Sequence, residues 1–435
     1  MNKLASIALL IGLSACSTLE STLDSATSIF DDEPEVQEVA ADTTEILFGS
    51  SSSKIDYDLA NTQNVIPSIE NNNAWQAHNI NRYYSNLRVN NVTELSESEH
   101  FSHDLTITPL VIGGYFYSLD SELNLAKYSK ADLDEPIWEQ LLIEDNPDGL
   151  KPTGLAFANN HVYISFDSGD IYAIDAELGN TTWQKNIGSP VVLPVIASND
   201  KLYIQTIDNQ LYAVEPTNGE IAWRHFATLE NTSLSLVPAP LIMERLIIAQ
   251  YSTGEIYGLN LINGKEKWLE QIDKTGKVPD LNALSKFMLT DGVRIFANSN
   301  NGKLYGLDAD SGNILWQESI TLASKPWLAG DYIYLIDNSQ NLVAINIAGG
   351  IKYITKLPQP LAEDDEQISW DKPLMANGDI ITLSKEGYLA VLDAQTGQVK
   401  SLQEAESGEY SDYLIVDGNL YTVSNGDLIK LQAEE

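Results

Sequence analysis

Few residues of this chain have the types and spacing that chemistry needs. The 435 residues include five histidines and one cysteine, Cys16. His100 and His103 form the one close histidine pair, and they lie in an acidic stretch, SESEHFSHD, that favours a solvated loop over a metal site. A single cysteine excludes an intramolecular disulfide and a cysteine metal cluster. Because the sequence also has no His-Glu-x-x-His motif, phosphate-binding glycine loop or Gly-x-Ser-x-Gly elbow, we expect no catalytic or metal-binding residues.

Two aspartates recur at equivalent positions, which favours a structural role. Asp175 lies in GDIYAIDAELGNTTW (169–183), and Asp308 lies in GKLYGLDADSGNILW (302–316). Because both aspartates recur in register with the surrounding pattern, we expect them to form turns rather than to act as acids or bases.

The pattern around these aspartates occurs eight times. Its central positions are Ala126, Tyr172, Tyr212, Tyr257, Tyr305, Val343, Ala390 and Ile429. A glycine follows seven residues later at Gly179, Gly219, Gly264, Gly312, Gly350 and Gly397. A tryptophan follows eleven residues later at Trp183, Trp223, Trp268 and Trp316, with Trp138 displaced by one residue. Two marks at fixed offsets make a chance similarity improbable.

Each repeat reads as four short strands. In the third repeat, alternating apolar and polar residues predict strands over 192–197, 201–206, 210–215 and 220–226, with a turn at 216–219. A period of about 40–45 residues built from four strands is typical of a β-propeller blade. We therefore expect an all-β, eight-bladed β-propeller with four antiparallel strands per blade. Each tryptophan is expected to pack against the neighbouring blade.

The last repeat predicts how the ring closes. Counting eleven residues from Ile429 passes the final residue, Glu435, so the last blade lacks its outermost strand. Trp75 follows the N-terminal region in a strand-like setting. We expect the segment 74–76 to supply the missing strand, which also removes an open sheet edge.

The N-terminus has the features of a secreted, anchored protein. Residues 1–15, MNKLASIALLIGLSA, predict a signal peptide because the apolar run is too short to span a bilayer. The sequence Leu13-Ser14-Ala15-Cys16 resembles the lipobox of bacterial lipoproteins, in which the cysteine is lipidated. In those proteins a non-acidic residue after the cysteine, here Ser17, accompanies outer-membrane location. We expect residues 16–72 to comprise the lipidated cysteine and an acidic, flexible tether, and residues 73–435 to form the propeller.

The charge of the chain excludes one class of partner. The 62 acidic and 25 basic residues give a formal net charge of −37. Nucleic-acid phosphates would be repelled by this charge, and the sequence has no basic stripe to bind them. We therefore expect no nucleic-acid partner.

The repeat resembles that of pyrroloquinoline-quinone (PQQ) dehydrogenase-like propellers. Together with the lipobox, the eight repeats and the length, it resembles the BamB family of the outer-membrane β-barrel assembly machinery over about residues 73–435. The stretches 83–88, 330–337 and 347–350 are also similar to that family.

The resemblance implies a scaffold without catalytic activity or cofactor. The scaffold would sit at the periplasmic face of the outer membrane, bind a periplasmic POTRA domain of BamA and assist unfolded β-barrel precursors. The family's Leu-x-Leu-Arg contact stretch corresponds here to 229–236. The resemblance therefore implies partner contacts at Leu229, Leu234, Ser235 and Leu236, with Ser235 in the place of the arginine.

Two alternatives share the fold. A PQQ-dependent dehydrogenase needs a quinone in the central funnel, a calcium ion, an aspartate base and, in that family, a vicinal disulfide that a chain with Cys16 alone lacks. A propeller that binds a secreted ligand or sugar at the cell surface is the other alternative. Proteolysis of intact cells distinguishes an outward-facing protein from a periplasmic one.

Overall fold

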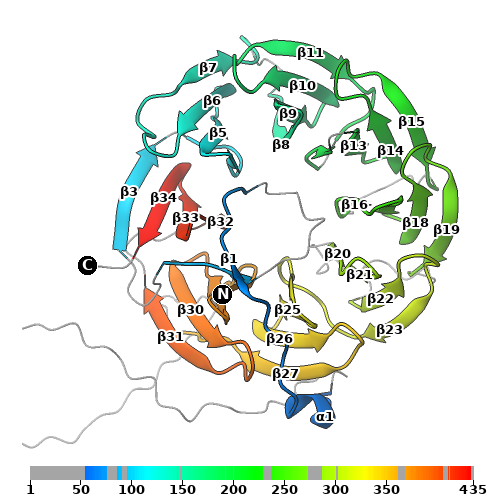
Figure 1. The fold of residues 1–435 in the computed structure, drawn as a ribbon, viewed down its shortest axis with the longest axis vertical. Coiled ribbons are helices and arrows are strands. Elements are labelled where there is room, and N and C mark those ends of the chain that lie inside the picture. The colour runs from blue at the N-terminus through cyan, green and yellow to red at the C-terminus, as the bar shows by residue number, and fades with distance from the viewer. Residues whose placement is uncertain are drawn as a thin grey trace, which may run out of the picture. The chain divides into compact units, whose positions relative to one another are not determined.

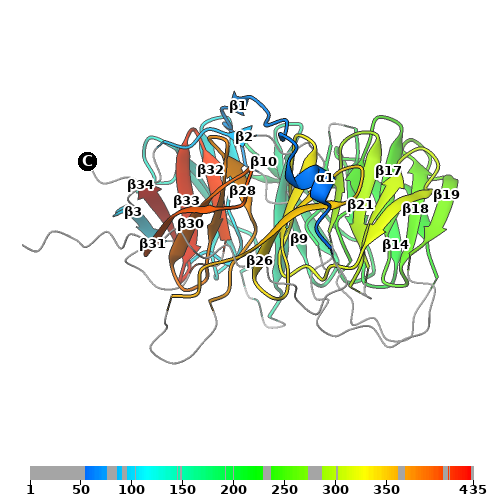
Figure 2. The same cartoon turned by 90° about the horizontal axis from the view of Figure 1, so that it is seen from below.

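The computed structural model describes a closed ring of antiparallel sheets within a compact unit that spans Thr44–Glu435 (Figure 1). The described residues are 54–75, 86–90, 96–102, 104–144, 146, 149–191, 193–198, 200–228, 237–272, 287–299, 302–360, 368–404, 410 and 412–432. Seen from the side, the strands run from one face of the ring to the other (Figure 2). The predicted all-β propeller is confirmed.

Six consecutive four-stranded sheets follow the chain around the ring. The first sheet consists of β4 (Leu110–Ile112), β5 (Tyr115–Leu119), β6 (Asn124–Ser129) and β7 (Trp138–Leu141). The second consists of β8 (Pro152–Ala158), β9 (His161–Phe166), β10 (Asp170–Asp175) and β11 (Thr181–Asn186). The third consists of β12 (Ile196–Ala197), β13 (Leu202–Gln205), β14 (Gln210–Val214) and β15 (Ile221–Phe226). The fourth sheet consists of β16 (Leu241–Ile242), β17 (Leu246–Gln250), β18 (Glu255–Asn260) and β19 (Glu266–Gln271). The fifth consists of β20 (Met288–Thr290), β21 (Arg294–Asn298), β22 (Leu304–Asp308) and β23 (Ile314–Glu318). The sixth consists of β24 (Trp327–Ala329), β25 (Tyr332–Ile336), β26 (Asn341–Asn346) and β27 (Ile351–Lys356).

The remaining two sheets use strands from both ends of the chain. One contains β28 (Leu374–Ala376), β29 (Asp379–Leu383), β30 (Tyr388–Asp393) and β31 (Val399–Glu404), extended by β2 (Asn86–Leu87) and β1 (Ile69–Glu70). The other contains β32 (Asp412–Val416), β33 (Asn419–Ser424), β34 (Asp427–Gln432) and β3 (Ser96–Ser102).

One sheet departs from the uniform set that the repeat predicts. Seven sheets have four strands, but the sheet of β28–β31 has six. Its additions are parallel, pairing Leu87 with Ala376 and Ile69 with Asn86. The prediction of eight uniform four-stranded blades is therefore corrected to seven such blades and one wider sheet. The repeat could not reveal β1 and β2, because these two-residue strands lie N-terminal to its first copy.

The repeat marks the same place in every sheet. All eight central positions lie on the strand next to the outermost strand of their sheets, from Ala126 on β6 to Ile429 on β34. In the third repeat, the four predicted strands are confirmed as β12–β15, with a shorter first strand. Residues from adjacent sheets share apolar clusters, as where Phe296 and Leu335 pack in one buried group. The core therefore consists of layers between blades.

The tryptophans and the glycines of the repeat are partners across the blade boundary. A methyl group on Gly312 would lie 2.4 Å from Trp268 of the preceding sheet, too close for any residue larger than glycine. The same relation joins Trp138 to Gly179, Trp183 to Gly219 and Trp223 to Gly264. Four indole N–H groups also donate to carbonyls of the next sheet, at Ala176 from Trp138, Pro216 from Trp183, Ala309 from Trp268 and Ile347 from Trp316. The predicted packing of tryptophan on the neighbouring blade is confirmed.

An N-terminal strand closes the last blade, but the strand is not the one predicted. β3 pairs with β34, from Ser96 opposite Gln432 to Ser102 opposite Asp427. The prediction that the segment 74–76 closes the last blade is therefore wrong. The sequence did not reveal β3 as a strand, because it is an acidic, polar stretch without apolar alternation. The backbone of His100 pairs with Ile429 in this strand, so the stretch predicted as a solvated loop is a strand. His103 lies outside the described residues.

Residues 54–75, which we call the strap, contact the ring although the sequence predicts a flexible tether up to residue 72. The strap contains the short helix α1 (Tyr57–Ala60) and begins beside β27, where the Asp56 amide donates to the Ile351 carbonyl at 2.8 Å. Asn64 is only 7% exposed, and its side-chain amide donates to the Tyr334 hydroxyl at 3.0 Å. These contacts place the described part of the predicted tether on the propeller.

Candidate functional site

The strap ends among the innermost strands of the ring. The Asn72 side chain donates to the Ile415 carbonyl at 2.8 Å, beside the last sheet. Trp75 then exchanges two backbone hydrogen bonds with Val111 on β4, of 2.7 and 2.8 Å. Trp75 therefore pairs with the first sheet and not, as predicted, with the outer edge of the last.

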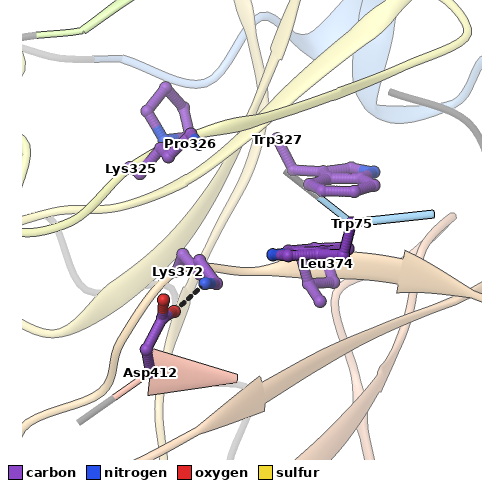
Figure 3. A pocket seen from close by; sticks show the side chains of 7 residues that line it. All are labelled: Trp75, Lys325, Pro326, Trp327, Lys372, Leu374 and Asp412. Atoms are coloured by element: carbon purple, nitrogen blue, oxygen red, sulfur yellow. Dashed lines mark hydrogen bonds and ion pairs between the residues drawn. The ribbon is translucent and has the colours of Figure 1, made fainter. Parts of the chain in front are cut away.

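The side chain of Trp75 enters a small pocket at the hub (Figure 3). We call this pocket the hub pocket; it is lined by Trp75, Lys325, Pro326, Trp327, Lys372, Leu374 and Asp412. Its free space is about 20 Å³, roughly the room of one water molecule. The Lys372 ammonium lies 5.6 Å from the centre of the Trp75 ring, within cation–π range. The indole nitrogen is buried and has no hydrogen-bond partner among the described residues.

A buried ion pair borders the hub pocket. Lys372 pairs with Asp412, and the two side chains are 12% and 25% exposed. The Thr108 hydroxyl also donates to Asp412, at 2.5 Å, and the Tyr413 amide donates at 2.8 Å. Burial alone would raise the pKa of Asp412, but the Lys372 charge and these hydrogen bonds hold it below its usual value. The first sheet, the wider sheet and the last sheet are thus joined through one carboxylate.

A second lysine gives the hub pocket its electrostatic character. Burial, and then the charge of Lys372, lower the pKa of Lys325 to about 7. Burial raises the pKa of the neighbouring Asp371. Near neutral pH Lys325 is therefore only partly protonated, and the pocket combines aromatic and aliphatic walls with the charged Lys372 ammonium.

The hub does not fit the quinone and calcium ion of the PQQ-dependent enzymes. Ligand pockets for molecules of that size hold several hundred Å³, about 300 or more, against the 20 Å³ found here. The Lys372 ammonium would repel a calcium ion, and Lys325 offers no oxygen ligand to one. Within the described ranges, no group of three or more His, Cys, Asp or Glu residues is placed to hold a metal ion.

The recurring aspartates form turns, as predicted. The Asp175 carboxylate accepts hydrogen bonds from the amides of Glu177 and Leu178, both at 2.8 Å. Asp308 accepts equivalent bonds from Ser311. The hydrogen bond from the Leu178 amide is the main reason that the pKa of Asp175 lies below its usual value. Neither carboxylate is arranged as a catalytic base.

The predicted partner contacts, Leu229, Leu234, Ser235 and Leu236, lie outside the described residues, so their role stays a prediction. The structure does describe how the preceding residue is held. The Thr228 amide and hydroxyl both donate to Glu255, at 3.1 and 2.8 Å, and Glu255 is only 8% exposed. The segment 229–236 therefore starts from a fixed point on the ring.

Next to this point lies a histidine that links stability to pH. The His225 ring lies 4.5 Å from the Tyr257 ring, and its Nδ1 lies 2.9 Å from the Tyr251 hydroxyl. Burial lowers the pKa of His225, although Glu266 and Glu255 oppose the shift. The folded protein therefore favours the neutral ring.

Lowering the pH is expected to destabilise the protein through His225. Because the pKa is lower in the folded state, the unfolded chain binds the proton more readily, and stability falls as the pH drops below about 6.5. Urea unfolding of wild type and His225→Phe between pH 7.5 and 5.5 measures this effect. The wild type should lose more stability than the variant over this range; parallel profiles would contradict the assignment.

Sequence reasoning missed the hub pocket. The sequence indicates a strand at Trp75, but Lys325, Lys372 and Asp412 stand outside the repeat marks and carry no motif. The feature that could have pointed to the pocket is their position in the chain, because each lies just before or at the start of an innermost strand. Residues 1–53, including Cys16, lie outside the described residues. In the part of the chain that the structure describes, no helix combines the length and apolar character needed to cross a bilayer.

Comparison with known proteins identifies relatives. An uncharacterised protein of Rickettsia conorii is 24% identical over 283 residues, covering 63% of this chain and 68% of the relative. The outer membrane protein assembly factor BamB of Yersinia pestis is 24% identical over 344 residues, covering 75% of this chain and 84% of that protein.

Solved structures share the fold. The crystal structure of BamB from Moraxella catarrhalis superposes with a TM-score of 0.64 at 18% identity, covering 78% of this chain and 99% of that one. The quinohemoprotein alcohol dehydrogenase of Comamonas testosteroni gives 0.58 at 15% identity, covering 80% and 78%. At these identities the superpositions show the fold alone. The family model described as outer membrane protein assembly factor BamB matches residues 97–354, more than half of the chain, and the chain belongs to that family.

Proposed function

We propose that this protein is a non-catalytic scaffold lipoprotein of the outer-membrane β-barrel assembly machinery. Membership of the BamB family is the observation that carries the proposal. The hub pocket is consistent with it, because its free space of about 20 Å³ is too small for a quinone. The ring is proposed to have eight blades, with β28–β31 as one of them, since Ala390 lies next to the outermost strand of that sheet as every other central residue does.

The protein is proposed to be anchored at the periplasmic face of the outer membrane through a lipidated Cys16. Three acyl chains, as in bacterial lipoproteins, would anchor it firmly because each buried methylene adds about 0.8 kcal/mol. The anchor would raise the local concentration of the propeller near a membrane-bound partner, so a modest direct interface would suffice.

Replacing Cys16 by serine is expected to release the protein from the membrane. Without the thiol no acyl chain can be attached, so the chain loses its proposed lipid anchor in the outer membrane. Fractionation of cells, with mass measurement of the N-terminal peptide, tests this prediction. Wild type should carry the lipid mass in the outer-membrane fraction; an unmodified Cys16 in wild type would contradict it.

The proposed partner is a BamA-like barrel protein, bound through its periplasmic POTRA domain. The segment that contains Leu229, Leu234, Ser235 and Leu236 is the proposed contact, held at its start by the bonds of Thr228 to Glu255. Unfolded β-barrel precursors are a further proposed partner, by pairing with exposed strand edges. The strap supports this mode within the chain, because Ile55 pairs in parallel with Ile351 on the outer strand β27.

Leu234→Asp is expected to weaken recovery of the BamA-like partner by about tenfold, as for an interface anchor of 1–2 kcal/mol. The measurement is a pull-down from membranes in mild detergent with quantitative mass spectrometry. Ile262→Asp is the matched control, because Ile262 is apolar and 82% exposed on a different turn. Equal recovery with both variants would exclude the Leu234 contact, and absence of any such barrel with wild type would exclude the function.

Surface proteolysis separates this function from the outward-facing alternative. Protease added to intact cells should spare a periplasmic scaffold and cut it only after the outer membrane is opened. Cleavage in intact cells would favour a propeller that binds a ligand at the cell surface.

A further inference from the structure

The contacts of Trp75 have the form of a bound peptide. Its backbone exchanges two hydrogen bonds with Val111 on β4, as a strand does when it pairs with an edge. Its side chain enters the hub pocket, where Trp327 and Leu374 form apolar walls (Figure 3). Backbone pairing combined with one side-chain pocket is how extended peptides are commonly recognised.

The hub pocket recognises the ring and not a particular hydrogen-bond donor. The Trp75 indole nitrogen is buried and has no hydrogen-bond partner among the described residues. The Lys372 ammonium faces the ring, an interaction that any electron-rich aromatic face provides. The pocket therefore fits aromatic side chains as a class.

The rest of this stretch is held mainly by hydrogen bonds near the surface: the Asp417 amide donates to the Asn72 carbonyl at 2.7 Å, and the Lys130 ammonium donates to the Asn73 carbonyl at 3.1 Å. Ile69 is 45% exposed, and both residues of β1 are exposed. Asn71 and Asn73 are exposed as well, and Asn72, Ala74 and Trp75 are half-buried. Segments with few buried contacts open at a small free-energy cost. Residues 71–75 bury little besides the Trp75 ring, so we expect this end of the strap to leave the hub pocket while the blades stay folded.

We propose that the hub pocket is a docking site for an extended segment of another polypeptide that presents an aromatic side chain, and that Trp75 occupies this site within the chain. The incoming segment would pair with Val111 on β4 and place its ring between Trp327 and Leu374. The site does not depend on the proposed BamA-like partner, because it lies at the innermost strands and not on the segment 229–236.

Opening the pocket tests the proposal. A dye-labelled peptide with the sequence of residues 69–75, IENNNAW, is titrated with full-length wild type and Trp75→Ala, and fluorescence anisotropy is recorded. The variant should bind the peptide saturably, and wild type should bind it at least about tenfold more weakly, because its own ring competes at millimolar effective concentration. The matched peptide IENNNAA should not bind. A folded variant that ignores IENNNAW, or binds both peptides equally, would overturn the proposal.

A second measurement keeps Trp75 and so does not depend on the folding of that variant. Ala74→Cys is made in a full chain whose Cys16 is replaced by serine, and the rate of thiol labelling at position 74 is followed. Millimolar IENNNAW should raise the rate at least about threefold by displacing the strap, and IENNNAA should not. An unchanged rate with IENNNAW would contradict exchange at the hub pocket.

Discussion

Replacing Trp268 by alanine is expected to lower the free energy of unfolding by about 3–5 kcal/mol, the range for removing a large buried aromatic side chain. Trp268 is 8% exposed and lies between two glycines, Gly258 of its own sheet and Gly312 of the next. Its indole also donates to the Ala309 carbonyl at 3.1 Å. The substitution therefore opens a gap between two blades and removes a bond that joins them. The midpoint of urea unfolding measures the loss.

Two further substitutions separate the packing of Trp268 from its hydrogen bond. Trp268→Phe keeps a ring but loses the N–H, and it should cost clearly less than alanine. Gly312→Ala should cost about 2–4 kcal/mol, because the residue has a φ of +75° and its methyl group would meet Trp268. Gly188→Ala is the matched control, with a φ of +80° but open space around the methyl group, and it should cost about 1–2 kcal/mol. Equal losses at the two glycines would contradict docking between blades.

Replacing Asp412 by alanine is expected to cost about 3–5 kcal/mol, the penalty for leaving a buried charge without its partner. Lys372 is 12% exposed and would lose its carboxylate, while Thr108 would lose its hydrogen-bond acceptor. Because the pKa of Asp412 is lowered in the folded protein, its contribution is present above the ordinary pKa of about 3.9 and is lost as the pH falls through the folded value. Urea unfolding at neutral pH measures the loss.

The exposed pair of Lys130 and Asp417 provides the control for this prediction. The two charges lie 2.7 Å apart, but their side chains are 18% and 48% exposed. Asp417→Asn removes the charge but keeps a residue type that tolerates the φ of +51° at this position. It should therefore cost less than about 1 kcal/mol, because water already screens the pair. A loss as large as that of Asp412→Ala would show that burial at the hub is not the reason for the larger effect.

The fold was predictable where the sequence repeats. The glycine and tryptophan marks each have a structural cause, because Trp268 fills the space that Gly312 leaves open in the next blade. A contact that is repeated around a ring leaves the same trace in every copy, so it can be read without an alignment. The turn role of Asp175 was predictable for the same reason, since this turn recurs with the repeat.

The parts that break the repeat were not predictable. β3 lies at the outer edge of its sheet, where a polar sequence leaves no apolar alternation to detect. Trp75 contacts Val111 and lines a pocket with Lys372, positions far from it in the sequence and unmarked by any motif. Such contacts depend on ring closure, which local patterns do not describe. The hub pocket therefore required the structure.

The most direct test of the proposed scaffold function is cross-linking of the wild-type protein in intact outer membranes, followed by mass spectrometry of the linked peptides. Carboxyl–amine cross-linking suits a chain with 62 acidic residues. The predicted result is a set of links between the propeller and the periplasmic domain of a BamA-like barrel protein, including links from residues near 229–236. Links confined to other proteins, with the barrel protein present and unlinked, would contradict the account.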